Sequence, residues 1–569
     1  MPSPAEVTYA WAATVLDALA GGGVRDVVIC PGARSAPLAL CADAHGGLRT
    51  FPVVDERSGA FLALGLALSS RRPAAMICTS GTAGANAYPA VIEAAMSHVP
   101  MVIITADRPP ELHGCGALQT IPQVPLFGAF ADCVDLPPPD VQAAYARVRI
   151  SGALAHATAA GRVLHVNVPL REPLAPETGP LPRGSSASAR HFVTAPAQPA
   201  DLASLTDILA AASRPVVVAG PRRPDAAFAA AAQSFAAALA APVLAEATSG
   251  LRFGPHATSS IAHYEALLRV PSLGEELRPD VIVRVGGPVT TRCLQSWVDL
   301  AGATVITLAD PGRVCDPARV SRFTVEAEPT AVLDVLARTL ARGGTRGWWE
   351  RWMRLDAVAT EVLSAELPAA APCTEPSLAR TVMESVPGGA ALFVSSSMPI
   401  RDLDAFVSRR SDPVDVFASR GASGIDGIVS TAFGVAAGSG RRTVLFTGDT
   451  AFLHDVGGLA WGARLRIPLC IVVVNNAGGR IFEFLPVASA TTRLNELFVM
   501  PHGVDLAHAA ALAGARLHRP ATGTALTRAV QEGLEGGVHV VEVQVDPSRV
   551  RADHDAAFAA VRRAVERAP

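Results

Sequence analysis

The chain of 569 residues contains no lysine, so its permanently positive side chains are all arginines. Schiff-base chemistry and pyridoxal phosphate sites need a lysine amine, and the Walker A phosphate loop also needs a lysine. The absence therefore excludes three common kinds of site. A GC-rich genome, which favours arginine and alanine codons, is a sufficient cause of the bias.

Charged residues are also scarce, at 17%, and the formal net charge is only -3. A nucleic-acid-binding surface needs clustered cations, and no basic stripe occurs in this chain. Half of the residues are hydrophobic and no long polar tract interrupts them. We therefore expect an ordered globular protein with no nucleic-acid partner.

Signals for export, membrane insertion and disulfide formation are missing as well. The N-terminus lacks a basic stretch followed by an apolar one, and the apolar stretch Phe228 to Leu244 is alanine-rich and too weakly hydrophobic for a membrane span. The nine cysteines never form a CxxC pair. We expect buried free thiols, no structural zinc, and a cytoplasmic protein.

The sequence alternates short apolar runs with helix-compatible segments throughout, which predicts an α/β protein with three doubly wound parallel-sheet domains. The first domain is predicted at 1–180 and the central domain at 201–345, with a proline-rich linker at 181–200. A tryptophan-rich connecting segment is expected at 346–373, before a third domain at 374–569.

The most specific chemistry lies in the stretch Arg442 to Pro486. Val444 to Thr447 and Ile467 to Val474 read as parallel strands, so the residues that follow them should lie at one edge of the sheet. One strand is followed by Gly448-Asp449 and the other by Asn475-Asn476-Ala477-Gly478. Carboxylate, amide and carbonyl oxygens are hard donors that suit Mg²⁺ together with a diphosphate.

This stretch resembles the thiamine diphosphate motif, which begins with Gly-Asp and closes on Asn-Asn. The resemblance implies thiamine diphosphate as the cofactor, with Mg²⁺ or Mn²⁺ held by Asp449, Asn476 and the carbonyl of Gly478. Taken singly, each pair would read as ordinary turn residues between strands.

Two further segments gain meaning beside this motif. Glu56 opens a predicted helix, where a carboxylate alone would indicate only a favourable interaction with the helix dipole. In the thiamine diphosphate superfamily, the matching glutamate hydrogen-bonds to the aminopyrimidine ring and promotes activation of the cofactor. Thr79-Ser80-Gly81 resembles the pyrimidine-binding loop, although a helix cap explains it equally well.

Four arginines follow predicted strands, at the edge where ligands bind in such sheets: Arg34, Arg108, Arg401 and Arg420. Arginine pairs with carboxylates through two parallel hydrogen bonds, so the group indicates substrates that carry several carboxylates. Surface salt bridges are the alternative for any one of them.

Together these segments resemble the 2-succinyl-5-enolpyruvyl-6-hydroxy-3-cyclohexene-1-carboxylate synthase family of menaquinone biosynthesis. The segments that carry the resemblance are CPGARSAPL, VDERSGAFLALGLA, TSGTAGANAYPAVIEA, TADRPPEL, RGASGIDGIVSTAFGVA, TGDTAFLHDVGGL and VVVNNAGGRIFEFLP. The resemblance implies a transferase that decarboxylates 2-oxoglutarate and adds the succinyl carbanion to isochorismate in a 1,4-addition.

The same resemblance implies roles for individual residues. Isochorismate would lie near Arg34, Arg108 and Gln119, and Arg292 stands where the family has a lysine. The carboxylates of 2-oxoglutarate would meet Ser397, Arg401 and Arg420. The cofactor would contact Glu56, Thr79, Ser80, Gly81, Gly424, Ile425, Gly448, Asp449, Asn476, Ile481 and Phe482.

This chain departs from the family pattern at Ala33, where a serine is common, at Leu118, where an asparagine is common, and at Arg292. These changes affect isochorismate binding more than the type of reaction. No histidine is convincingly placed as a general acid, and His454 is equally compatible with a structural role.

Because the ring and diphosphate sites lie in different predicted domains and meet across two chains in the superfamily, we expect a homodimer or homotetramer with Glu56 at the interface. The alternatives are an acetohydroxyacid synthase-like carboligase and a non-catalytic binding module. A nicotinamide-binding protein is disfavoured, since no G-x-G-x-x-G follows a strand.

Overall fold

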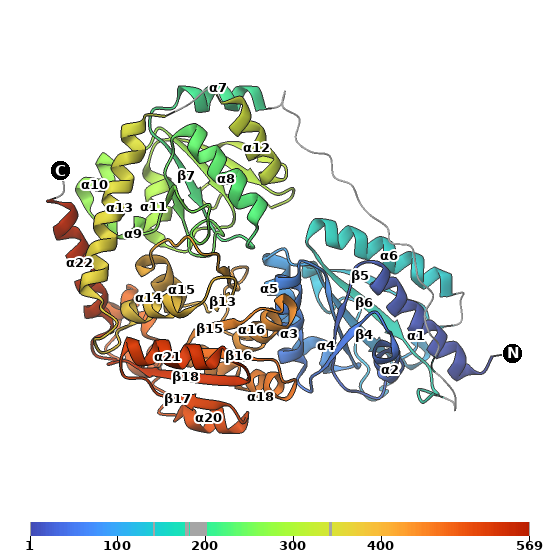
Figure 1. Ribbon diagram of the computed structural model, residues 1–569. Coiled ribbons are helices and arrows are strands. Elements are labelled where there is room, and N and C mark those ends of the chain that lie inside the picture. The colour runs from blue at the N-terminus through green and yellow to red at the C-terminus, as the bar shows by residue number, and fades with distance from the viewer. Residues whose placement is uncertain are drawn as a thin grey trace.

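The computed structural model describes residues 2–139, 143–176, 181, 202–313, 315–340 and 344–567. Three six-stranded sheets are present, and every pairing between neighbouring strands is parallel. Helices separate most of the successive strands, so the predicted fold class is confirmed (Figure 1). The predicted linker at 181–200 lies almost wholly outside the described residues.

The first sheet has the order β2-β1-β3-β4-β6-β5. Its strands are β1 (Asp26–Ile29), β2 (Arg49–Pro52), β3 (Ala74–Cys78), β4 (Met101–Asp107), β5 (Ala131–Asp135) and β6 (Val163–Pro169). Its helices are α1 (Pro4–Gly21), α2 (Ala36–Ala44), α3 (Glu56–Ser70), α4 (Thr82–Asn86), α5 (Tyr88–Met96) and α6 (Ala143–Ala160). Strands β3, β4 and β6 are buried along their whole length, as expected for a sheet covered on both faces.

The second sheet has the order β12-β11-β10-β7-β8-β9. It contains β7 (Pro215–Ala219), β8 (Val243–Ala245), β9 (Ser260–Ile261), β10 (Val281–Val285), β11 (Thr304–Ala309) and β12 (Ser321–Glu326). Its helices are α7 (Ala203–Ala211), α8 (Ala226–Leu239), α9 (Tyr264–Leu268), α10 (Pro271–Glu276), α11 (Arg292–Leu300) and α12 (Pro329–Thr339).

The third sheet has the order β14-β13-β15-β16-β18-β17. It contains β13 (Ala391–Val394), β14 (Asp415–Phe417), β15 (Thr443–Gly448), β16 (Leu469–Asn475), β17 (Arg516–His518) and β18 (Val538–Gln544). Its helices are α14 (Glu375–Ser385), α15 (Met398–Phe406), α16 (Ile428–Ser439), α17 (Asp449–His454), α18 (Val456–Arg464), α19 (Val487–Ala490), α20 (Leu506–Leu512), α21 (Gly523–Gly533) and α22 (Val550–Val565).

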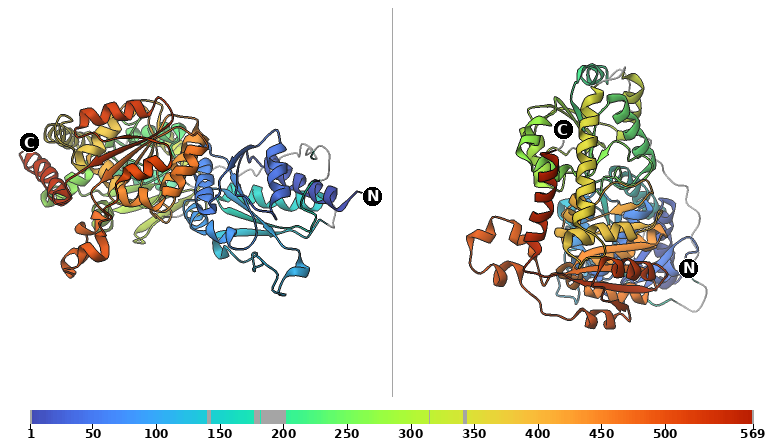
Figure 2. Two further views of the ribbon diagram at one scale, coloured as in Figure 1. Left: turned by 90° about the horizontal axis from the view of Figure 1, so that it is seen from below. Right: turned by 60° about the vertical axis from the view of Figure 1, so that its left-hand side comes forward.

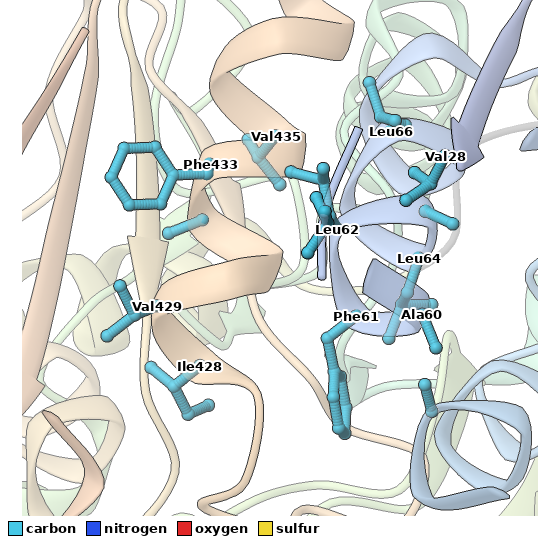
Figure 3. Packing of buried hydrophobic residues seen from close by; sticks show 14 of the residues in the cluster. Val28, Ala60, Phe61, Leu62, Leu64, Leu66, Ile428, Val429, Phe433 and Val435 are labelled. Atoms are coloured by element: carbon cyan, nitrogen blue, oxygen red, sulfur yellow. The ribbon is translucent and has the colours of Figure 1, made fainter. Parts of the chain in front are cut away.

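Helices α3 and α16 join the first and third sheets, and their buried side chains form one cluster (Figure 3). A Cβ added to Gly434 would lie 2.3 Å from the carbonyl oxygen of Leu62, and one added to Gly65 would lie 2.1 Å from that of Thr431. Glycine at both positions therefore lets the two helix backbones touch, which fixes how the two sheets face each other.

Long helix α13 (Arg346–Glu366) follows the middle sheet and lies beside the C-terminal helix α22 (Figure 2). Trp348 and Trp352 pack edge to face with ring centroids 6.1 Å apart, inside a hydrophobic cluster. These two tryptophans therefore serve core packing. Within the described ranges, none of the helices is both long and apolar enough to cross a membrane.

Two helical segments are interrupted, and one prediction about the cysteines was wrong in part. The segment after β3 breaks at Ala87, between α4 and α5, because Pro89 lies in the first turn of α5 and has no N–H to continue the preceding helix. The segment after β15 breaks at Asp455, between α17 and α18. The nine cysteines are free, but two of those expected to be buried, Cys115 and Cys133, are exposed.

Candidate active site

Asp449 and Asn476 lie side by side because they follow β15 and β16, which are hydrogen-bonded neighbours. Asp449 opens α17, and its Oδ2 accepts the N–H of Gly478 at 2.9 Å. Both side chains are buried, and the Oδ1 atom of Asn476 is a buried acceptor without a hydrogen-bond partner. The sequence-predicted ligand pair is thus brought together, with one oxygen left free.

The segment after β16 closes over this cluster. The N–H of Gly479 donates to Val499 O at 2.8 Å, and Gly478 has a φ of 123°, which favours glycine. The Gly478 carbonyl accepts the N–H of Arg480 at 2.9 Å and keeps a second lone pair. His502 Nε2 lies 3.2 Å from Asp449 Oδ2, so this histidine contacts the cluster.

A second buried group supports the cluster from α14 and α22. Asn476 Nδ2 donates to Glu375 Oε1 at 2.6 Å, and His554 Nε2 donates to Asp402 Oδ1 at 2.8 Å. Burial raises the pKa of Glu375 to about 7. Burial by itself would lower the pKa of His554, but the Asp402 carboxylate outweighs it and raises that pKa to about 9. His554 is therefore a buried cation at neutral pH.

Glu56 is the first residue of α3, at the carboxyl-end edge of the first sheet. The neighbouring Asp55 caps the helix by accepting the N–H of Arg57 at 3.0 Å. Because Asp55 forms this cap, the Glu56 carboxylate is not used in it. The Glu56 carboxylate has no hydrogen-bond partner among the described residues. Burial raises the pKa of the Cys78 thiol, and the nearby Glu56 carboxylate raises it further, which places Glu56 beside the end of β3.

The loop Thr79-Ser80-Gly81 follows β3, and its helix-cap interpretation fails. Gly81 occupies the cap position of α4 with a φ of 80°, and no side chain makes a cap hydrogen bond there. Instead, the Gly81 N–H donates to Gln123 Oε1 at 2.9 Å, and Ser80 accepts a hydrogen bond from Arg108. The loop is thus held by a polar network of its own sheet.

Arg34, Arg108 and Gln119 form the first arginine group. Arg108 donates to Ser80 through Nη1 and to Gln119 Oε1 through Nη2, the latter at 3.3 Å. Burial lowers the pKa of Arg34, and the charge of Arg108 lowers it further. Arg34 donates to Leu170 O at 2.9 Å, while its buried Nε has no partner. One buried N–H donor is therefore available to an anion.

Ser397, Arg401 and Arg420 form the second arginine group, next to the third sheet. Arg401 Nη1 donates to Ser397 O at 2.5 Å, and burial together with the charge of Arg420 lowers the pKa of Arg401. Arg420 has a buried Nε without a partner, as Arg34 does, and borders a cavity of about 540 Å³. Burial and the charge of Asp404 raise the pKa of the neighbouring Glu246 to about 8.

The residues of RGASGID are held by a carboxylate that the sequence did not single out. Glu93 on α5 accepts the N–H groups of Gly421, Ala422 and Ser423 at 2.8, 2.7 and 3.1 Å, and its side chain is 4% exposed. Gly424 and Ile425 follow immediately, and Ile425 packs against the cluster that joins the sheets. The first sheet therefore fixes the loop that was predicted to wedge the cofactor.

The remaining predicted residues lie farther from these groups or at their margins. Arg292 begins α11 and is exposed, two residues beyond Thr290, which hydrogen-bonds to Glu246. Ile481 and Phe482 lie in a 3-10 turn, where Phe482 packs against Phe498 with ring centroids 5.4 Å apart. No contact of the described residues joins Arg292 to the two arginine groups directly.

Glu93, Glu375 and His502 are the contacts that sequence reasoning missed. Each of these residues is far along the chain from its partner, so no local spacing in the sequence predicted the contact. An acidic residue inside an otherwise apolar helix pattern, such as Glu93 in YPAVIEAAM, was the one available signal.

The all-oxygen donor set and the free Oδ1 of Asn476 fit a hard divalent cation. The free carboxylate of Glu56 fits a ring with an amino or imino group, and the two arginine groups fit separate anionic substrates. The arrangement can therefore hold a metal-bound diphosphate and two acids.

Comparisons with known proteins define the class. Residues 10–126 match the family model for the N-terminal TPP binding domain of thiamine pyrophosphate enzymes, and residues 404–543 match the C-terminal one. A crystal structure of benzoylformate decarboxylase from Polynucleobacter necessarius is similar at a TM-score of 0.70 and 17% identity, covering 96% of this chain and 99% of that one. The chain is a thiamine diphosphate enzyme in fold and domain content.

Full-length relatives then identify the family. The 2-succinyl-5-enolpyruvyl-6-hydroxy-3-cyclohexene-1-carboxylate synthase of Myxococcus xanthus is 47% identical over 98% of both chains. Synthases of the same name from Chloroflexus aurantiacus (98% of this chain, 97% of that one) and Bacillus velezensis (96% of both) are 38% and 39% identical. This chain belongs to the 2-succinyl-5-enolpyruvyl-6-hydroxy-3-cyclohexene-1-carboxylate synthase family.

Proposed function

We propose that the protein uses thiamine diphosphate to decarboxylate 2-oxoglutarate and to add the succinyl unit to isochorismate, as the family name and its domains support. The observation that carries the proposal is the division of arginines into two groups. Each group has one buried Nε–H without a partner, so two acids can be bound at once. When bound, the cofactor supplies the nucleophilic carbon and the electron sink that loss of CO₂ requires.

The chain's own residues have distinct roles in this proposal. Glu56 accepts a hydrogen bond from the aminopyrimidine and so favours the tautomer that acts as an internal base. Thr79, Ser80 and Gly81 would contact the same ring, and Ile425 would also contact the cofactor.

Asp449, Asn476 and the carbonyl of Gly478 are proposed to hold Mg²⁺ or Mn²⁺, with Gly448 next to the diphosphate. The free Oδ1 of Asn476 supports this assignment. His502 Nε2 lies 3.2 Å from Asp449 Oδ2 and would compete with a cation for that oxygen. Ile481 and Phe482 line the approach to the cofactor.

Arg34, Arg108 and Gln119 are proposed to bind isochorismate, and Ser397, Arg401 and Arg420 to bind 2-oxoglutarate. Arg292, the first residue of α11, is proposed to contribute to isochorismate binding. Ala33 and the exposed Leu118 cannot donate the hydrogen bonds that serine and asparagine would provide, so isochorismate binding relies more on the arginines.

We further propose the domain limits predicted above: 1–180, 201–345 and 374–569, joined by 181–200 and 346–373. The protein is also proposed to be a cytoplasmic homodimer or homotetramer. Four apolar side chains on the segment after Gly478 are exposed, which favours a second chain that covers it: Leu485, Leu497, Met500 and Val504.

The test is to incubate purified protein with thiamine diphosphate, Mg²⁺, 2-oxoglutarate and isochorismate, and to follow consumption of both acids. The proposal expects their consumption in equal amounts. Decarboxylation of 2-oxoglutarate with isochorismate left untouched would instead favour a different carboligase.

Glu56→Gln separates catalysis from cofactor binding. Turnover should fall at least about 100-fold because the amide cannot act as the same acid–base partner. Cofactor affinity measured by calorimetry should change little, since the amide still hydrogen-bonds. Unchanged turnover would remove Glu56 from this role.

A further inference from the structure

We propose that Glu375 is a positioning residue that turns the side-chain oxygen of Asn476 toward the metal. This inference rests on the proposed function, because it assumes that Asn476 is a metal ligand. Glu375 lies on α14, about a hundred residues before Asn476 in the chain, and was not among the residues that the family motif singled out.

The hydrogen bond between Asn476 and Glu375 is short and buried from solvent. Asn476 Nδ2 lies 2.6 Å from Glu375 Oε1, and the two residues are 7% and 3% exposed. Oε1 of Glu375 is the acceptor in this contact, so the NH₂ end of the amide must face Glu375. The Oδ1 end then points to the other side, where it has no partner among the described residues.

The direction of this amide matters because its two ends are opposite in character. The oxygen end is a hard donor that suits a divalent cation, whereas the NH₂ end would repel one. Rotation of the amide by half a turn barely changes its shape, so packing alone does not choose between the two states. The hydrogen bond that Asn476 Nδ2 donates to Glu375 Oε1 does choose between them.

Glu375 is itself fixed in place by its own helix. It is the first residue of α14, and Thr374 and Ser377 form a reciprocal cap around it. Its carboxylate, the Asp402 carboxylate and the His554 imidazole offer atoms that all lie within 4.8 Å of one another. The acceptor that faces Asn476 therefore has little freedom to move.

These three groups resemble a metal site of their own, but the hydrogen bonds argue against it. His554 uses Nδ1 toward Val550 O at 2.8 Å and Nε2 toward Asp402 Oδ1 at 2.8 Å. Both ring nitrogens thus face acceptors, so each carries a proton and neither has a lone pair for a cation. The group is a support beneath the Asn476 ligand, and His554 offsets part of its negative charge.

The experiment measures Mg²⁺ affinity, by calorimetry at saturating thiamine diphosphate, for wild type and two matched variants. Glu375→Met fills a similar volume without an acceptor, and Glu375→Gln keeps an oxygen that can accept from Asn476. We expect Glu375→Met to weaken Mg²⁺ binding about 10- to 100-fold, and Glu375→Gln to change it by less than about threefold. A purely structural role would lower the thermal midpoint without this difference in metal affinity.

Equal Mg²⁺ affinity for wild type and Glu375→Met would overturn the inference, as would equal losses in both variants. If Glu375→Met does not fold, Glu375→Asp replaces it, because the shorter side chain keeps the charge and withdraws the acceptor. Weaker binding by Glu375→Asp supports the inference, and unchanged binding refutes it.

Asp449→Ala separates this inference from the proposed function. If wild type binds Mg²⁺ and Asp449→Ala does not, the metal site is real and the Glu375 variants decide the inference alone. If wild type itself takes up no Mg²⁺ with the cofactor, the metal site and this inference fail together.

Discussion

The first and third sheets of this protein have the same strand order but present different functional groups at the ends of their strands. Each has its first strand between its second and third, and its sixth between its fourth and fifth. Helices α3 and α16 occupy the same place in the two units, between the second and third strands, and pack against each other. After the third and fourth strands the first sheet presents Ser80 and Arg108, whereas the third presents Asp449 and Asn476.

The strand order determines where the ligand-binding edge of each sheet lies. The residues that follow the strands then determine the charge of that edge. Parallel strands place the residues after neighbouring strands side by side in both units. Neutral and cationic residues at one edge suit an uncharged ring and acids, and oxygen donors at the other suit a metal. Under the function proposed above, two copies of one architecture would divide one cofactor between them.

The largest difference in cofactor affinity is expected from substitutions just after the third strand of each sheet. Asp449→Ala should weaken Mg²⁺-dependent cofactor binding at least about 100-fold, because the metal loses its one charged ligand. Ser80→Ala, its counterpart in the first sheet, should leave that affinity within about threefold and raise the KM for isochorismate about tenfold through the loss of its contact with Arg108.

Calorimetry with the cofactor and steady-state kinetics check both variants. Similar losses of cofactor affinity in the two would show that the edges are not specialised as described.

Glu93 tests the connection between the two units. Glu93→Gln replaces one acceptor oxygen by an NH₂ group that faces backbone N–H donors of 421–423. The thermal midpoint should fall by about 5 °C, and kcat/KM for 2-oxoglutarate should fall about tenfold as the loop before Ile425 loosens. Ser97→Ala is the control, because Ser97 gives Glu93 only one neutral hydrogen bond, at 2.6 Å. Equal effects of Glu93→Gln and Ser97→Ala would contradict the role of Glu93 in holding residues 421–423.

The smallest expected effect is the dependence of stability on pH, which has opposite signs in the two units. Burial lowers the pKa of His165 on β6 to about 4, while Thr105 and Cys133 contact its ring. The unfolded chain then binds more protons below the ordinary histidine pKa of about 6.5. The stability that this histidine contributes is therefore complete above pH 6.5 and is lost as the pH falls toward 4, by at most about 3 kcal/mol.

His554 behaves in the opposite way, since its pKa is raised to about 9 beside Asp402 and Glu375. Its contribution is complete below pH 6.5 and is lost as the pH rises through 9, again by at most about 3 kcal/mol. Urea denaturation across this pH range measures both limbs. His165→Gln should flatten the acidic limb and His554→Gln the alkaline one, and an exchange of these outcomes would refute the assignment.

Much of this fold was predictable from the sequence because the strands are short apolar runs that end in turn residues. Two neighbouring strands were predicted from Val444 to Thr447 and from the run that ends at Asn475-Asn476. Strands β15 and β16 pair as expected. Local spacing was sufficient there because the residues that follow neighbouring parallel strands must share an edge. Arg34 and Arg108 follow β1 and β4, which β3 separates, so this reasoning alone did not predict their proximity.

Other features could not be predicted because their partners are distant in the chain. Glu93 reads as one acid in an apolar helix until Gly421 is placed against it. His502 and Glu375 have no pattern that links them to Asp449 or Asn476. The break of α17 at Asp455 depends on Ser430, whose N–H donates to the buried carboxylate of Asp455 at 2.7 Å.

By itself the sequence determined at which strand ends the candidate residues stand, because strand periodicity and turn residues act over a few positions. Only the tertiary structure decided which of them are buried, which atoms are already hydrogen-bonded, and which are left free for a ligand. The free Oδ1 of Asn476 and the free carboxylate of Glu56 depend on Glu375 and Asp55, which hold the adjacent donors. Such contacts arise from packing of whole helices and sheets, which no local pattern encodes.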